Sequence, residues 1–328
     1  MFTNSLWMPY RGTAFPKRAF VLIILLFNAG NTFGRIKTDS IYSFSMGTDV
    51  KITMDVTKLK KSKKGILVIY ALPNGNTTEQ TMGKKMKEGD DWHFDIQHIR
   101  AQTKFVRNQL SDENIIVAYL ENSFKSWPTW KTKHMDYITL TQRIVDTLYK
   151  LIPLKKKIIY LDSHSGGGRF IFDYLDGVKT IPSYIKRISF LDSDYGYDSS
   201  YLLKLKTWVK KDNQNFLLVF AYNDSIALYN GKPFVSATGG TWYRSHLMLK
   251  ELAPYFDFRK TEDDSLVIIK STNNRIQFFF KTNPLRIIYH TKQVELNGFI
   301  HSIFAGTKYD SKGYRYFGKR AYEDLIEE

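Results

Sequence analysis

Cysteine is absent from this sequence of 328 residues. Its absence excludes a thiolate nucleophile, a zinc site built on cysteine, a disulfide framework and a lipid-modified cysteine anchor. The chain also lacks internal repeats, low-complexity linkers and a clear domain boundary beyond its amino-terminal segment. We therefore expect residues 35–328 to form a single domain, which is long enough to bury a sizeable core.

Signatures of nucleic-acid binding are absent as well, although the formal net charge is +16. The lysines are scattered, as in "KLKKSKK" and "LKKKI" ahead of apolar runs, where such residues usually lie on solvated strand entries. Neither an RNP pattern nor a zinc-finger spacing accompanies them. We therefore expect no nucleic-acid partner, and the positive charge fits a polyanionic substrate such as an acidic polysaccharide.

The amino-terminal residues have the pattern of an export signal. Three basic residues precede "AFVLIILLFNAG", an apolar run from Ala19 to Gly30. A run of this length is too short to span a bilayer comfortably and is typical of a secretory signal. We expect residues 1–34 to be a signal peptide, or an uncleaved signal anchor that would add membrane contact. In both cases the body of the protein would be secreted or periplasmic.

Short apolar runs alternate with segments of helical periodicity along most of the chain. The runs "GILVIYAL", "NIIVAYL", "KIIYLDS" and "NFLLVFAY" are typical of buried strands. This alternation predicts an α/β fold with a mostly parallel central sheet and helices on both faces. From Asp264 onward, turn residues between apolar runs indicate the last edge of the sheet or a small C-terminal hairpin.

The stretch "KIIYLDSHSGGGRF" carries the strongest chemical signal. It places Ser165 between a predicted strand and a predicted helix, with Ser163 and Gly167 two residues to either side. Small residues at this spacing permit the sharp turn on which a serine nucleophile is exposed, and the N–H of Gly166 would face a developing oxyanion. The alternatives are a purely structural turn and a phosphate-binding turn, although the Lys-Ser/Thr pair of a P-loop is missing.

With this S-x-S-x-G variant of the G-x-S-x-G elbow, residues 45–310 resemble the α/β-hydrolase superfamily. The resemblance implies a nucleophile after the fifth strand, an acid after a later strand and a histidine last. It makes Ser165 the nucleophile and His301, in the turn-containing segment "ELNGFIHSIF", the base. His290, inside the strand-like pattern "RIIYHTKQ", is the alternative base, and His246 could line the pocket.

The acid of the triad and the second oxyanion donor are each open between neighbouring residues. The resemblance favours Asp224, which follows "LLVFAYN", over Asp192 or Asp194 one strand earlier, although an aspartate after a strand is often only a helix cap. The donor is expected in the loop after "ILVIYAL". The candidates in that loop are Asn74, Gly75 and Asn76.

Aromatic and basic residues are predicted at the substrate-binding edge of the sheet. Trp242 and Trp127 could stack on a sugar, and Arg244 could bind a carboxylate. The segment "WHFDIQH" has two histidines five residues apart, which is not the spacing of a helical zinc pair. We therefore expect neither a metal nor a cofactor.

Together these features predict an exported serine hydrolase. A carboxylic ester is the preferred substrate, either a small molecule or a glycan ester that is acidic, acylated or methylated. An exported serine peptidase of the same fold is one alternative. A non-catalytic glycan-binding protein on a hydrolase scaffold is the other, although a serine, an acid and a late histidine occur in the expected order.

Overall fold

The computed structural model describes residues 39–47, 49–233, 235–263 and 265–328. These residues belong to one of the two units into which the chain divides, Arg35–Glu328. The predicted export signal lies outside the described residues, so export stays a prediction. None of the helices in the described ranges has the length and hydropathy of a membrane span.

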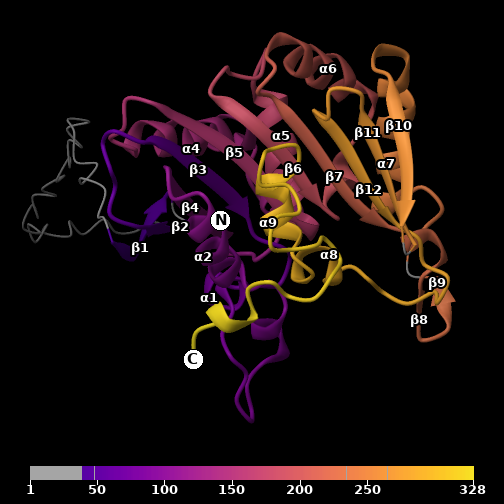
Figure 1. Cartoon of the computed structure of the whole chain (residues 1–328), viewed down its shortest axis with the longest axis horizontal. Coiled ribbons are helices and arrows are strands. Elements are labelled where there is room, and N and C mark those ends of the chain that lie inside the picture. Colours follow the sequence, from indigo (N-terminus) through magenta and orange to yellow (C-terminus); the bar gives the residue numbers. More distant parts are fainter. Residues whose placement is uncertain (1–38, 48, 234, 264) are drawn as a thin grey trace, which may run out of the picture. The chain divides into compact units, whose positions relative to one another are not determined.

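A mixed, mostly parallel sheet of ten strands forms the centre of the described part of the chain, in the order β1-β2-β4-β3-β5-β6-β7-β12-β11-β10 (Figure 1). The run from β4 to β12 is parallel throughout, and antiparallel pairs extend the sheet at both ends. The strands are Ser40–Met46 (β1), Val50–Val56 (β2), Lys64–Ala71 (β3), Glu113–Asn122 (β4), Lys157–His164 (β5), Ile185–Leu191 (β6), Phe216–Tyr222 (β7), Phe258–Asp263 (β10), Leu266–Ser271 (β11) and Ile276–Lys281 (β12); Leu228–Tyr229 (β8) and Lys232–Pro233 (β9) form a separate pair.

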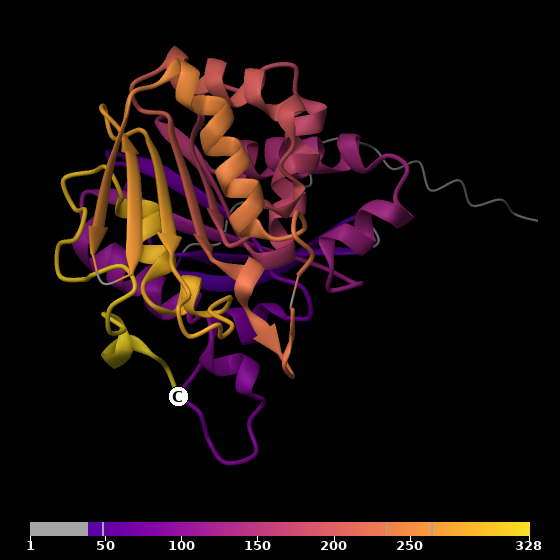
Figure 2. The ribbon, with the colours of Figure 1, turned by 90° about the vertical axis from the view of Figure 1, so that its right-hand side faces the viewer.

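The helices cover both faces of this sheet, as the alternation of the sequence predicts (Figure 2). The apolar side chains of α3, α4, α5, α6 and α7 belong to one buried cluster, and those of α2, α8 and α9 belong to the other. The helices are Thr78–Met82 (α1), Ile99–Gln109 (α2), Trp127–Lys133 (α3), Tyr137–Leu151 (α4), Gly168–Gly177 (α5), Leu202–Lys211 (α6), Thr241–Leu252 (α7), Lys292–Glu295 (α8) and Gly298–Phe304 (α9).

Strand β3 shows why the strand sequences are continuously apolar. Its alternate residues Leu67 and Ile69 face the first cluster, while Val68 and Tyr70 face the second. A strand that is covered on both faces has no solvent side and therefore no polar alternation. The predicted C-terminal hairpin is the antiparallel meander β10-β11-β12, which joins the sheet because β12 pairs in parallel with β7.

Candidate active site

Ser165 lies on a strained turn between β5 and α5. It begins a short 3-10 helix, Ser165–Gly167, and its φ of +55° is in the left-handed region that side chains with a Cβ rarely adopt. Such strain persists only where the surrounding packing enforces it, and it is concentrated at functional sites. The predicted sharp turn between strand and helix is therefore present, with a strained backbone at Ser165.

The glycines of the turn allow close contact with the neighbouring loops. A Cβ on Gly167 would lie 2.1 Å from the carbonyl oxygen of Ala71, and a Cβ on Gly168 would lie 1.7 Å from that of Ser193. The small residue before the elbow, Ser163, is fully buried, and its hydroxyl lies 2.8 Å from the hydroxyl of Ser193. The sequence pattern is thus explained by packing between the ends of β3, β5 and β6.

Gly168→Ala is expected to destabilise the fold and to displace the turn, because the added methyl group would overlap a backbone carbonyl. We expect a loss of about 3 kcal/mol or more in the free energy of unfolding, measured by urea titration. The control is Gly89→Ala, where an added Cβ would meet no atom within 4 Å and only the positive φ would cost about 1 kcal/mol. Equal stability of the two variants would contradict the packing argument.

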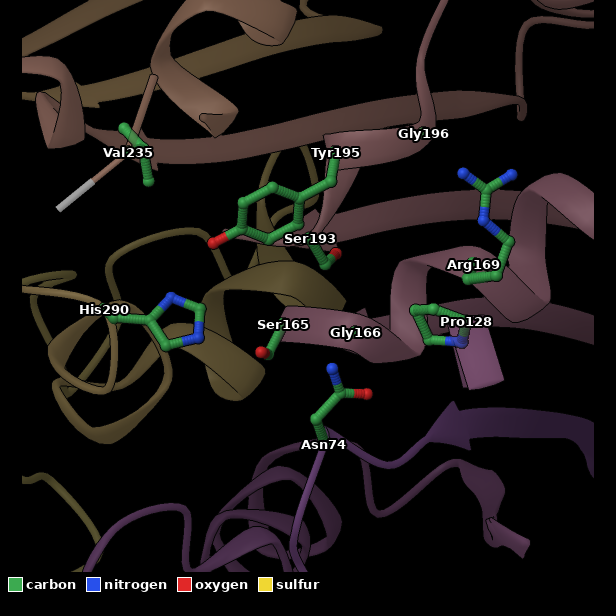
Figure 3. Close-up of a pocket in the computed structure, with 10 residues that line it drawn as sticks. All are labelled: Asn74, Pro128, Ser165, Gly166, Arg169, Ser193, Tyr195, Gly196, Val235 and His290. Atoms are coloured by element: carbon green, nitrogen blue, oxygen red, sulfur yellow. The ribbon is translucent and has the colours of Figure 1, made fainter. Parts of the chain in front are cut away.

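Ser165 opens into a cavity of about 370 Å³ at the carboxyl ends of the parallel strands (Figure 3). Parallel α/β sheets bind ligands at this edge because the loops that follow their strands converge there. The cavity is lined by residues from the loops after β3, β4, β5, β6, β7 and β12. They are Asn74, Pro128, Ser165, Gly166, Arg169, Ser193, Tyr195, Gly196, Val235 and His290.

His290 and Asp192 form a hydrogen-bonded pair beside Ser165. Nδ1 of His290 lies 2.5 Å from Oδ2 of Asp192, which is fully buried, while the imidazole is about one-fifth exposed to the cavity. Figure 3 shows the imidazole facing Ser165 with its other nitrogen. Because a carboxylate only accepts hydrogen bonds, Nδ1 carries a hydrogen, and in the neutral imidazole Nε2 is then an acceptor. The structure thus brings together a serine, a histidine and an aspartate.

His164 packs against the ring of His290. Its side chain is buried, its Nε2–H donates to the backbone carbonyl of His290 at 3.2 Å, and the two ring centroids are 4.6 Å apart. Burial, with a smaller contribution from the nearby imidazole, holds the pKa of His164 well below its usual value. The ring is therefore a neutral support that adds no charge to the site.

The predicted base, His301, lies in α9 and does not line the cavity of Ser165. Its side chain is buried, with Nδ1 at 2.8 Å from the hydroxyl of Tyr314 and its ring stacked on Tyr316. Burial lowers the pKa of His301 below its usual range. The segment that resembled a loop is a short helix, with Asn297 as its left-handed N-cap. His290, the alternative base, is instead the histidine that lines the cavity.

The favoured acid, Asp224, caps α7 instead of contacting a histidine. Its Oδ2 accepts from the backbone N–H of Thr241 at 2.8 Å. Burial and the neighbouring Asp192 raise its pKa to about 7. Asp194 accepts from the hydroxyl of Ser245 at 2.8 Å, and burial raises its pKa well above the usual value. Of the three candidate aspartates, Asp192 is the one in contact with a histidine in the cavity.

Asp162, buried in β5 behind the turn, should make stability depend on pH. Burial raises its pKa to about 7, although the hydroxyl of Ser302 donates to its carboxylate. The folded state therefore holds a proton that the unfolded state loses above its pKa of about 4, so the stability falls as the pH rises from about 4 to about 7. Asp162→Asn removes this loss, so it should stabilise the protein at pH 8 by at most about 4 kcal/mol and have little effect at pH 4.

Urea titrations at several pH values check this expectation. The control is Asp112→Asn. The side chain of Asp112 is 89% exposed, so this substitution should leave the pH dependence of stability unchanged. The same pH dependence in Asp162→Asn and in the unchanged protein would contradict a raised pKa at this position.

The candidate donors for an oxyanion lie in different surroundings in the structure. Gly166 and Asn74 line the cavity, and a Cβ on Gly166 would lie 2.0 Å from Oδ1 of Asn74. Gly75 instead donates its N–H to the carbonyl of Lys125 at 2.8 Å, and Asn76 is buried. The N–H of Gly166 belongs to the first turn of a helix, where backbone donors have no intrahelical partner. Of the candidate oxyanion donors, Gly166 and Asn74 are therefore the ones that line the cavity beside Ser165.

The three side chains expected to bind substrate have packing roles. Trp127 is buried against Phe170, with ring centroids 4.8 Å apart, and Trp242 packs edge-on against Phe280. Arg244 donates to the carbonyl of Tyr197 at 3.0 Å. None of the three lines the cavity.

Arg169, Tyr195 and Pro128 line the cavity instead, and none of them was predicted from the sequence. Arg169 could have been found from its spacing, because it follows the serine by four residues at the start of a predicted helix. The other two follow strands, but nothing in their sequence context marks them as cavity residues.

Groups of three or more metal-binding side chains are not found in the described part of the chain. The histidines of "WHFDIQH" pair with carboxylates instead. His93 lies 2.5 Å from Asp91, and His98 lies 2.8 Å from Asp95.

No protein-family model matches this chain, and no curated protein matches it in sequence. Among solved structures it is similar to one described as "A structural characterization of poly(aspartic acid) hydrolase-1 from Sphingomonas sp. KT-1". The two share 11% sequence identity and a TM-score of 0.45, over 81% of this chain and 97% of the other. At this level of similarity the function must be argued from the residues of the cavity.

Proposed function

We propose that this protein is a serine hydrolase of the α/β-hydrolase type, with Ser165 as the nucleophile, His290 as the base and Asp192 as the acid. The observation that carries the proposal is the His290–Asp192 pair, 2.5 Å apart, in the same cavity as a serine with a φ of +55°. The strand order supports it too, because the serine follows β5 in a parallel run and the histidine follows the last strand of that run.

Each residue has a role that follows from its contacts. Asp192 holds the hydrogen on Nδ1 of His290, so that Nε2 can take the proton from the hydroxyl of Ser165 as the serine attacks a carbonyl carbon. The backbone N–H of Gly166 and a donor of Asn74 would stabilise the oxyanion. His290 then gives its proton to the leaving group. In the second half of the reaction His290 takes a proton from water, the water attacks the acyl-enzyme, and the proton returns to Ser165 as the acid leaves.

A carboxylic ester remains our preferred substrate, and export through residues 1–34 belongs to the same proposal. The prediction that this ester belongs to a glycan loses its main support, because the tryptophans expected to stack on sugars pack inside the protein. A catalytic role is favoured over glycan binding alone by the hydrogen-bonded pair beside the serine.

The test uses the purified protein and a fluorophosphonate probe, which reacts with activated serines. We expect labelling of the peptide that contains Ser165, and hydrolysis of short acyl esters faster than of the matching amides. Faster hydrolysis of the amides would assign a peptidase-like enzyme instead. Folded protein that neither reacts with the probe nor hydrolyses either series would overturn the proposal.

A further inference from the structure

Arg169 is a charged cavity residue to which the proposed mechanism gives no role. It lies in the first turn of α5, four residues after Ser165, and lines the same cavity with its side chain 27% exposed. An arginine has five N–H donors in a fixed planar arrangement and stays charged at any physiological pH.

Within the described ranges, the guanidinium of Arg169 forms a long ion pair but no hydrogen bond. Its Nη1 lies 3.8 Å from Oδ1 of the buried Asp173, and the same oxygen is 2.9 Å from Nζ of Lys131. Among the described residues, none accepts a hydrogen bond from Arg169. Its donors are therefore available to a ligand in the cavity.

Gly196 provides the space that the guanidinium occupies. A Cβ on Gly196 would lie 2.7 Å from Nη2 of Arg169, so any larger residue would displace the charged group. Both residues line the cavity. Packing against Gly196, together with the 3.8 Å ion pair to Asp173, thus holds the guanidinium at the cavity wall.

The position of Arg169 relative to His290 indicates which part of a substrate it meets. Figure 3 shows the two residues on opposite sides of Ser165. His290 must stand next to the leaving group, because it gives that group a proton. The acyl part of the substrate then extends away from His290, towards Arg169.

We propose that Arg169 binds a carboxylate at the far end of the acyl group, so that the enzyme selects monoesters of dicarboxylic acids. This inference rests on the proposed serine hydrolase function. A guanidinium pairs with a carboxylate through two parallel hydrogen bonds, which gives both charge and orientation. The side chains of Pro128 and Tyr195 line the cavity too and fit a short apolar chain between the two carbonyl groups.

The test compares monoethyl esters of succinic, glutaric and adipic acid with ethyl esters of butanoic, pentanoic and hexanoic acid, followed by pH-stat titration. We expect a higher kcat/KM for at least one monoester than for the neutral ester of the same chain length. Arg169→Gln should lower kcat/KM for that monoester on the order of 10- to 100-fold, as for the loss of a hydrogen-bonded ion pair. The neutral esters should change by less than about 3-fold.

The matched control is Arg143→Gln, which removes an exposed arginine of α4 and should leave both series unchanged. An equal loss for acidic and neutral esters in Arg169→Gln, or no loss at all, would overturn the inference. The inference would also be overturned if the protein without substitutions showed no preference for any of the monoesters. Labelling by a neutral fluorophosphonate separates this failure from that of the proposed function, because the serine would still react if only the carboxylate site were wrong.

Discussion

Ser165→Ala should abolish fluorophosphonate labelling and lower kcat for the best ester by at least about 10,000-fold. The variant keeps the fold but has no oxygen to attack the carbonyl, so only binding and the oxyanion donors remain. His290→Gln should cause a loss of similar size, because the serine then has no base. Both are measured as the initial rate of ester hydrolysis and as labelling per folded molecule.

His301→Gln is the control for the base. His301 lies in α9 against Tyr314, away from the cavity, so the variant should lose stability but keep its labelling per folded molecule. Circular dichroism before labelling gives the folded fraction. A loss of labelling in His301→Gln with full labelling in His290→Gln would restore the histidine that the sequence analysis favoured.

The sharp turn at Ser165 could be predicted from sequence because its constraints are local. A strand, a turn with small residues around Ser165 and a helix follow one another within a few positions, and the turn chemistry fixes which residues fit. The parallel sheet was predictable for the same reason, since alternation is a property of consecutive residues. The structure adds the strand order, which depends on pairings between residues far apart in the chain.

The presence of His290 in the cavity, in place of His301, could not be predicted because it depends on tertiary contacts. Residues 287–290 look like a strand, yet β12 has already ended at Lys281 and Ile287 is 46% exposed. Conversely, Asn297 looks like part of a loop but caps the helix that carries His301. Apolar periodicity over so few residues does not distinguish an exposed loop from a strand.

Asp192→Asn should lower kcat by about 10,000-fold, while Asp224→Asn should lower it by less than about 10-fold. An asparagine at position 192 would present an NH₂ group to Nδ1 of His290 and favour the tautomer with its hydrogen on Nε2, which cannot take a proton from Ser165. An asparagine at position 224 can still accept from Thr241 at the start of α7, because asparagine caps helices about as well as aspartate.

All three aspartates are buried close together, so their variants must be compared to show which of them acts on the histidine. Asp194→Asn serves as the second control, since Asp194 contacts Ser245 and not the imidazole. The three variants are compared by kcat for one ester after their folded fractions have been matched by circular dichroism. A larger loss in Asp224→Asn than in Asp192→Asn would show that the catalytic histidine is oriented from β7, and the 2.5 Å contact between His290 and Asp192 would then be structural only.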